Sequence, residues 1–209
     1  MMRLSILAAG MIAVLCVATA AQAEMLTNAG FETGDWSGWT VRTTENGMTT
    51  VQDVVTYDID GPGPLGESLV GHLDVGKVTA GGPNGGVEVV QALYLTAGTE
   101  YAFSANLSAF MNDEHWGNGD GGHFEFIVGD KVLETWSSGV FNPMAYKYYE
   151  MSGSYTPTVD GYCDVGLRIT REFLVSTYLN QYIDNVSFVP EPASFALLAL
   201  GGLAVLRRR

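Results

Sequence analysis

The chain has 209 residues, of which 4–20 and 193–206 are almost wholly apolar, so that 24–189 offers 166 residues of mixed composition, enough for one domain. That interior carries six lysines and arginines against 22 acids, a net charge of about −16, with abundant glycine and aromatic residues. Such an excess repels phosphate backbones and anionic lipids, so it excludes nucleic-acid binding and docking to membranes through a basic patch, and favours cations or neutral partners.

The N-terminal segment has the three parts of a secretory signal. Arg3 precedes an apolar stretch from Leu4 to Ala18, and Ala21-Gln22-Ala23 places small residues where signal peptidase requires them. We therefore expect a signal peptide over residues 1–23, and we expect it to form a helix. A retained anchor is the alternative, but the segment is short and followed by a cleavage site. After processing, Cys163 is the one remaining cysteine, so no intramolecular disulfide can form.

Between 24 and 189 the apolar residues recur with a period of two, which is typical of strands. Strands are predicted over 69–75, 87–95, 101–109, 124–128, 132–136 and 163–169. The segments 87–95 and 101–109 are expected to pair as antiparallel neighbours joined by a short loop, and the segments on either side of Gly129-Asp130 to form a hairpin. No stretch has a sustained helical period. The prediction is an all-β, two-sheet antiparallel β-sandwich of the jelly-roll type with nine or ten strands.

The face of the strand on which a residue lies, and the composition of the segment around it, distinguish core residues from candidate ligand-binding residues. Cys163 shares the apolar face of its strand, which favours a buried thiol over a nucleophile, and Trp39 opens a strand, which favours the core. Trp116 instead lies in a polar, glycine-rich loop over 112–123, where a large ring either packs down or meets a ligand. We predict a ligand site at Trp116 with Asp113 and Asn118 as hydrogen-bonding partners.

The sequence gives little support for further metal sites or for catalysis. The same loop could hold a second cation, but it lacks the EF-hand pattern, and three histidines with one cysteine make a zinc site hard to assemble. Tyr146, Tyr148 and Tyr149 form a possible aromatic platform, although alternation places at least one in the core. There is no Gly-x-Ser-x-Gly, His-Glu-x-x-His or phosphate-binding loop, so we expect no catalysis; a glycosidase-like carboxylate pair among the acids stays an open alternative.

The C-terminus is built in three parts. Pro190-Glu191-Pro192 is followed by 14 apolar residues over 193–206 and by Arg207, Arg208 and Arg209. As a helix the apolar part would reach about 21 Å against a hydrocarbon core of about 30 Å, a marginal anchor, and the arginines would remain cytoplasmic.

This tail, over 190–209, resembles the PEP-CTERM sorting signal of exported bacterial proteins. The resemblance implies recognition by exosortase, processing near the Pro-Glu-Pro, transient anchoring in the inner membrane by the hydrophobic helix, and delivery to the cell surface or the extracellular matrix.

Three segments of the interior resemble jelly-roll carbohydrate-binding modules and related galactose-binding-like domains. They are Asn28-Ala29-Gly30-Phe31-Glu32 followed by Gly38-Trp39, the stretch 90–104, and Tyr182-Ile183-Asp184-Asn185. The resemblance implies a structural Ca²⁺ bound by Glu32 and Asp184, with the Gly30 carbonyl as a further ligand; Ca²⁺ accepts six to eight oxygen ligands, carbonyls included. The alternative is that Glu32 caps local amides and Asp184 only ends a strand.

The sequence as a whole predicts an exported, non-catalytic surface or matrix protein whose domain over 24–189 binds or sits within extracellular polysaccharide. The competing interpretation is a structural or adhesive matrix protein with no glycan site.

Overall fold

The computed structural model describes residues 23–114, 119–176 and 178–191. Glu24–Val189 forms one compact unit. The two expected terminal helices, over 1–23 and 193–206, lie almost entirely outside the described residues. Within the described part, no helix is long and apolar enough to cross a membrane.

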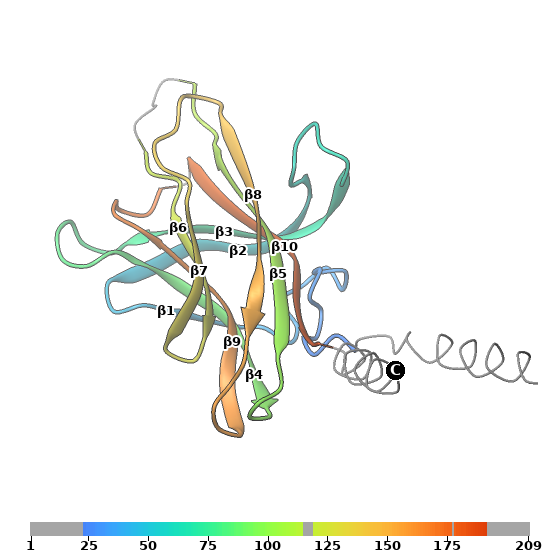
Figure 1. Ribbon diagram of the computed structural model, residues 1–209. Helices are drawn as coiled ribbons and strands as arrows, with labels where there is room; N and C mark the ends of the chain where they lie inside the picture. The colour runs from blue at the N-terminus through green and yellow to red at the C-terminus, as the bar shows by residue number, and fades with distance from the viewer. Residues whose placement is uncertain (1–22, 115–118, 177, 192–209) are drawn as a thin grey trace, which may run out of the picture. The chain divides into compact units, whose positions relative to one another are not determined.

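All regular structure in these residues is β-structure, arranged as two antiparallel five-stranded sheets (Figure 1). One sheet has the order β1-β4-β9-β6-β7 and the other β2-β3-β10-β5-β8, and we name them the β9 sheet and the β10 sheet after their central strands. The all-β, two-sheet prediction is thereby confirmed. The strands are β1 (Thr40–Thr43), β2 (Gly47–Asp58), β3 (Glu67–Lys77), β4 (Gly85–Leu95), β5 (Tyr101–Met111), β6 (His123–Val128), β7 (Lys131–Ser137), β8 (Tyr146–Tyr155), β9 (Gly161–Arg171) and β10 (Leu179–Pro190).

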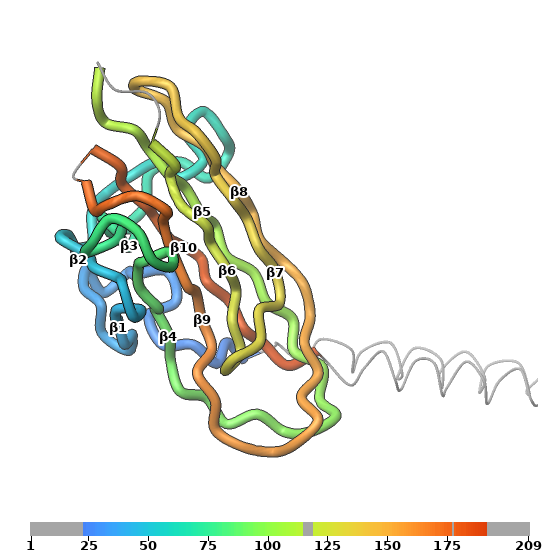
Figure 2. The backbone as a smooth tube through the Cα atoms, turned by 90° about the vertical axis from the view of Figure 1, so that its left-hand side faces the viewer, coloured from blue at the N-terminus to red at the C-terminus, as the bar shows by residue number. Residues whose placement is uncertain are grey.

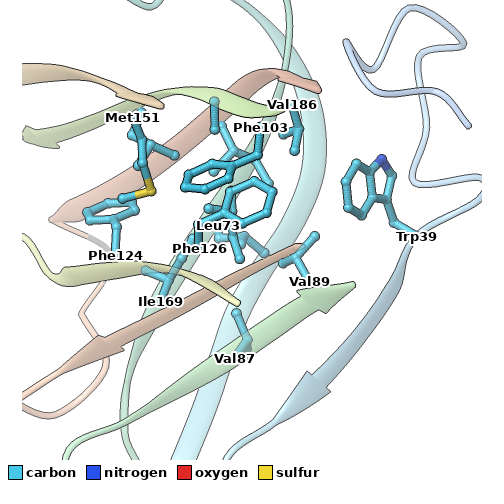
Figure 3. Packing of buried hydrophobic residues seen from close by; sticks show 14 of the residues in the cluster. Trp39, Leu73, Val87, Val89, Phe103, Phe124, Phe126, Met151, Ile169 and Val186 are labelled. Carbon is cyan, nitrogen blue, oxygen red and sulfur yellow. The ribbon is translucent and has the colours of Figure 1, made fainter. Parts of the chain in front are cut away.

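The core lies between the two sheets and is filled by the alternate residues that point inward from each strand. Figure 3 shows the rings of Phe103 and Phe126 together in its centre, stacked with centroids 4.3 Å apart. Phe188 continues this stack to Tyr101 at 5.1 Å. These rings come from both sheets, so their packing fixes the sheets against each other.

One predicted hairpin is confirmed and one predicted strand pair is wrong. β6 and β7 pair across the Gly129 turn, where φ is +58°, a conformation that favours glycine. β4 and β5, by contrast, lie in different sheets, where β4 pairs with β1 and β9, and β5 pairs with β8. The connection over 96–100 crosses from one sheet to the other, which five residues can span because the sheets lie about 10 Å apart.

The segment before β1 packs on the end of β10. Phe31 is completely buried, and it stacks on Trp39 at 5.9 Å; Trp39 is 8% exposed, which confirms it as a core residue. A side-chain carbon at Gly71 would lie only 2.8 Å from the Phe31 ring, so β3 needs glycine there. The Val186 amide donates to the Ala29 carbonyl over 3.1 Å, and residues 29–32 are thereby held beside β10.

Candidate functional site

Aromatic side chains gather on the outer face of the β10 sheet. Asp53, His72 and Tyr182 are successive partners across β2, β3 and β10. Tyr182 stacks on His72 at 4.8 Å and on Tyr57 at 3.9 Å, with interplanar angles of 19° and 13°. We name these residues the outer aromatic face, which also includes Tyr148, Asn106 and Asn180.

Polar groups hold these rings in place. The ring nitrogens of His72 lie 2.8 Å from Asp53 Oδ1 and 2.9 Å from Asn180 Oδ1, and the Tyr148 hydroxyl donates to Asn106 Oδ1 over 3.1 Å. The Asp53 side chain is 54% exposed, so it can also reach solvent or a ligand. The face therefore combines flat rings with hydrogen-bonding oxygens, the composition typical of binding sites for small polar molecules.

A second, smaller apolar cluster lies on this face. Ile59, Val70 and Tyr182 form it, with partly buried side chains from β2, β5 and β8 around them. It exists because the β2–β3 connection folds over the sheet towards β8 (Figure 2), where the Tyr146 hydroxyl donates to the Asp60 carbonyl over 3.3 Å. Burial raises the pKa of the Tyr182 phenol above its ordinary value.

Two buried polar atoms of the same face are unsatisfied in the part of the chain that the structure describes. Asp74 Oδ1 and Ser108 Oγ form no well-aligned hydrogen bond, although their residues are 1% and 0% exposed; their polar neighbours are His72 Nε2, 3.7 Å from Asp74 Oδ1, and the Tyr57 side chain beside Ser108. Burial raises the pKa of Asp74, while the nearby His72 lowers it. Since an unsatisfied buried polar group is costly, these atoms point to water or ligand groups on this face.

The structure brings Gly30, Glu32 and Asp184 together. A side-chain carbon built on Gly30 would lie 3.5 Å from Asp184 Oδ1 and 3.8 Å from Glu32 Cγ. Asp184 is 1% exposed, and it accepts hydrogen bonds from Ser68 Oγ over 2.9 Å and from the Asn185 amide over 2.7 Å. Burial raises the pKa of Asp184, and the Glu32 carboxylate adds to the rise.

The donor set at this place fits calcium better than zinc. It offers two carboxylates and the Asn185 amide oxygen, which lies 3.7 Å from the same point above Gly30. No group of three or more His, Cys, Asp or Glu side chains suited to a metal occurs among the described residues. Calcium accepts carbonyl, amide and water oxygens to complete its shell, whereas a structural zinc site requires four nitrogen or sulfur ligands.

The predicted loop site is described only in part. Trp116 and Asn118 lie outside the described residues, and of Asp113 the structure shows that its carbonyl accepts a hydrogen bond from the Met144 amide over 3.1 Å. Tyr149 packs inward, stacked on Trp136 at 5.5 Å, whereas the register of β8 turns Tyr146 and Tyr148 outward. The expectation that at least one tyrosine of this group belongs to the core is met in part, because Tyr149 packs against the core but is only partly buried.

The sorting motif is likewise described only at its start. Pro190 ends β10 and Glu191 follows it, while Pro192, Arg207, Arg208 and Arg209 lie outside the described residues.

Sequence reasoning did not single out Tyr57, His72 or Tyr182. Each lies on a strand whose alternation marks the core, and it is the pairing of β3 with both β2 and β10 that brings the three together. One usable signal was the alternation in β10, which turns Tyr182 to the same side as Asp184 and away from buried Ile183.

Comparison with solved structures finds several that cover most of the chain. TmCBM61 in complex with β-1,4-galactotriose shares 19% identity over 81% of this chain and 99% of that one, with a TM-score of 0.45. The Stig cyclase Fisc from Fischerella sp. TAU shares 17% over 81% and 97%, with a TM-score of 0.49. The CBM22-1 xylan-binding domain from Paenibacillus barcinonensis shares 15% over 82% and 97%, with a TM-score of 0.40.

The similar structures thus include both carbohydrate-binding modules and cyclases. No curated protein sequence matches the chain. Residues 188–209 match the family model of the PEP-CTERM protein-sorting motif. The chain therefore carries a PEP-CTERM sorting motif, which marks exported proteins that are processed at the cell envelope.

Proposed function

We propose that this is a non-catalytic protein of the cell surface or extracellular matrix that binds a neutral polysaccharide on its outer aromatic face. The observation that carries the proposal is the stack of Tyr57, Tyr182 and His72 on one sheet face, bordered by Asp53 and Asn180. A pyranose ring has an apolar C–H surface that packs on a flat aromatic ring, and its hydroxyls require hydrogen-bonding partners around the edge.

The negative charge of the outer aromatic face favours neutral over anionic polysaccharides. Asp53 and Asp74 lie on it, and the net charge of the domain is about −16. Uronic-acid or sulfated polymers would meet repulsion here, so a neutral polysaccharide is the better partner.

Calcium would act as a structural clip in this proposal. Glu32, Asp184 and the carbonyl of Gly30 would hold the ion, and it would tie the segment before β1 to β10. Export requires signal peptidase and exosortase as partners, with the C-terminal helix as a transient inner-membrane anchor and cleavage near Pro190-Glu191-Pro192.

The ligand site would extend into the loop after β5. Asp113 is the second residue after that strand, and Trp116 and Asn118 belong to the same loop. A ring at Trp116 would add a further stacking position.

The second candidate is a structural or adhesive matrix protein with no glycan site. It is favoured by the burial of the aromatic face under the β2–β3 connection, since Tyr182 is only 7% exposed and the rings already pack on one another. In this case the rings serve stability alone.

A glycan array probed with the purified protein separates the two candidates. We expect binding to neutral glycans that is lost in Tyr57→Leu, which keeps apolar packing but removes the flat ring. The matched control is Tyr162→Leu, which changes a tyrosine that is 78% exposed on the β9 sheet and should leave binding unchanged. Loss of binding in Trp116→Ala alone would place the ligand in the loop, and no binding of the wild type to any glycan would favour the matrix protein.

A further inference from the structure

Two carboxylates at the end of β2 lie together without a positive partner. Asp58 is the last residue of β2, and Asp60 follows it in the β2–β3 connection with 8% of its surface exposed. Oδ1 of each side chain is buried and, in the part of the chain that the structure describes, has no hydrogen-bond partner other than the facing carboxyl group. Burial, and then the adjacent Asp60 carboxyl group, raise the pKa of Asp58. Two buried acceptors therefore face each other.

A third acid stands next to this pair. Glu67 is the direct partner of Asp58 in the β2–β3 ladder, and like charges opposite each other in a strand pair are destabilising. Among the described residues, no lysine or arginine forms a salt bridge with Asp58, Asp60 or Glu67. Within residues 23–114, 119–176 and 178–191, therefore, no lysine or arginine relieves this repulsion, and a cation from solution would do so.

The connection holds the Asp60 carboxylate in one orientation. The Leu65 amide donates to Asp60 Oδ2 over 3.1 Å, and the Gly63 amide donates to the Asp60 carbonyl over 3.3 Å. A side-chain carbon at Gly63 would lie 1.8 Å from Asp60 Oδ2, so the connection wraps the carboxylate as only glycine permits. One oxygen is thus bound by the connection, and the other is left free beside Asp58.

We propose that Asp58 and Asp60 bind a divalent cation, with Ca²⁺ as the ion that fits best. The two carboxylates supply the charge, backbone carbonyls and water complete the shell, and Glu67 contributes to the local negative potential. No histidine or cysteine takes part, so the site is one for a hard cation, and Ca²⁺ tolerates an irregular oxygen shell better than Mg²⁺. The site is separate from Glu32 and Asp184 and does not depend on glycan binding.

The ion has a structural consequence. Asp60 accepts the Tyr146 hydroxyl at its carbonyl, so a cation on its carboxylate fixes the β2–β3 connection over the outer aromatic face. Neighbouring Ile59 is completely buried in the small apolar cluster of that face.

Calorimetric titration of the full-length protein, purified in detergent and freed of metal with a chelator, tests the proposal. We expect Asp60→Asn to bind one Ca²⁺ fewer than the wild type. Asp130→Asn, which changes an exposed acid in the β6–β7 turn, should bind the wild-type number. Asp184→Asn reports separately on the other calcium site, so the two sites can fail independently.

A melting curve recorded without calcium is the control that shows whether the variants are folded. Asp60→Asn should melt at the wild-type temperature or above it when calcium is absent, because the substitution removes a repulsive charge, and it should lose part of the rise in melting temperature that calcium gives the wild type. Asp58→Asn provides a second variant with the same expected loss of one ion. Wild-type stoichiometry and an unchanged calcium response in both variants would overturn the proposal.

Discussion

The surroundings of Asp184 predict how its contribution to the free energy of unfolding changes with pH. Burial raises its pKa above the ordinary value near 4, and the Glu32 carboxylate raises it further. A carboxyl group with a higher pKa in the folded protein binds its proton more tightly there. Its contribution to stability is therefore present below about pH 4 and is lost as the pH rises through the folded-state pKa. Without calcium, we expect the wild type to lose stability relative to Asp184→Asn as the pH rises above about 4.

Calcium should reverse this loss, because it stabilises the ionised carboxylate. One ion at 100 times its Kd adds about 2.7 kcal/mol to the free energy of unfolding. For a domain of this size, 1 kcal/mol shifts the melting temperature by about 2–4 °C, so one site is worth about 5–11 °C. Asp184→Asn keeps the size of the side chain and loses its charge, and should lose both the fall with pH and this calcium-dependent rise.

Differential scanning calorimetry at pH 4, 5.5 and 7, with calcium or with chelator, measures both effects. Glu32→Gln should lose the same calcium-dependent rise, and Asp130→Asn should keep it. A calcium shift in Asp184→Asn equal to that of the wild type would show that Asp184 is no ligand. A wild-type melt that does not respond to chelator at pH 7 would refute the calcium clip altogether.

Three further substitutions or treatments test the scaffold. Arg171, 2% exposed, donates to the carbonyls of Asp120 and Val75 over 2.7 and 3.1 Å, so Arg171→Met should cost about 3–5 kcal/mol, seen as a lower urea midpoint. Gly71→Ala places a methyl group against Phe31 and should cost about 1–3 kcal/mol in the same assay, and an unchanged midpoint would contradict that packing. Cys163, predicted as a buried thiol, is partly buried against the core, and this burial raises its pKa. A thiol reagent at pH 8 should therefore modify it more slowly in the folded protein than in urea, and equal rates would refute this packing.

Periodicity located six of the ten strands, β3, β4, β5, β6, β7 and β9, but not all of their neighbours. The two-residue period of 87–95 and 101–109 fixes which side chains point inward, and both segments are strands whose alternate residues are buried. A period carries no information on which sheet a strand joins. The hairpin at Gly129 could be predicted because its turn is short and needs a positive φ, whereas the connection over 96–100 is long enough to change sheets.

The candidate sites likewise differ in how far they could be predicted from the sequence. Glu32 and Asp184 were predicted from the likeness of two motifs, since nothing in their spacing of 152 residues brings them together. The outer aromatic face depends on contacts between β2, β3 and β10, and Tyr57 and Tyr182 meet only after the sheet has formed. Asp58 and Asp60 are close in sequence, but their missing partners become visible only when burial is known.

The excess of acid is unevenly compensated over the two sheets. Arg42, Glu88, Arg168 and Glu125 are successive partners across β1, β4, β9 and β6, and they form a row of ion pairs at 2.6 to 3.0 Å on the outside of the β9 sheet.

The β10 sheet has no such row in the part of the chain that the structure describes. Its acids Asp53 and Asp74 have His72 beside them, and Asp58, Asp60 and Asp184 form no salt bridge with a lysine or arginine. Carboxylates that are buried without a positive partner must either take up protons or bind a cation. At neutral pH the second course keeps them ionised, and it is the course that we propose for Asp184 with Glu32 and for Asp58 with Asp60.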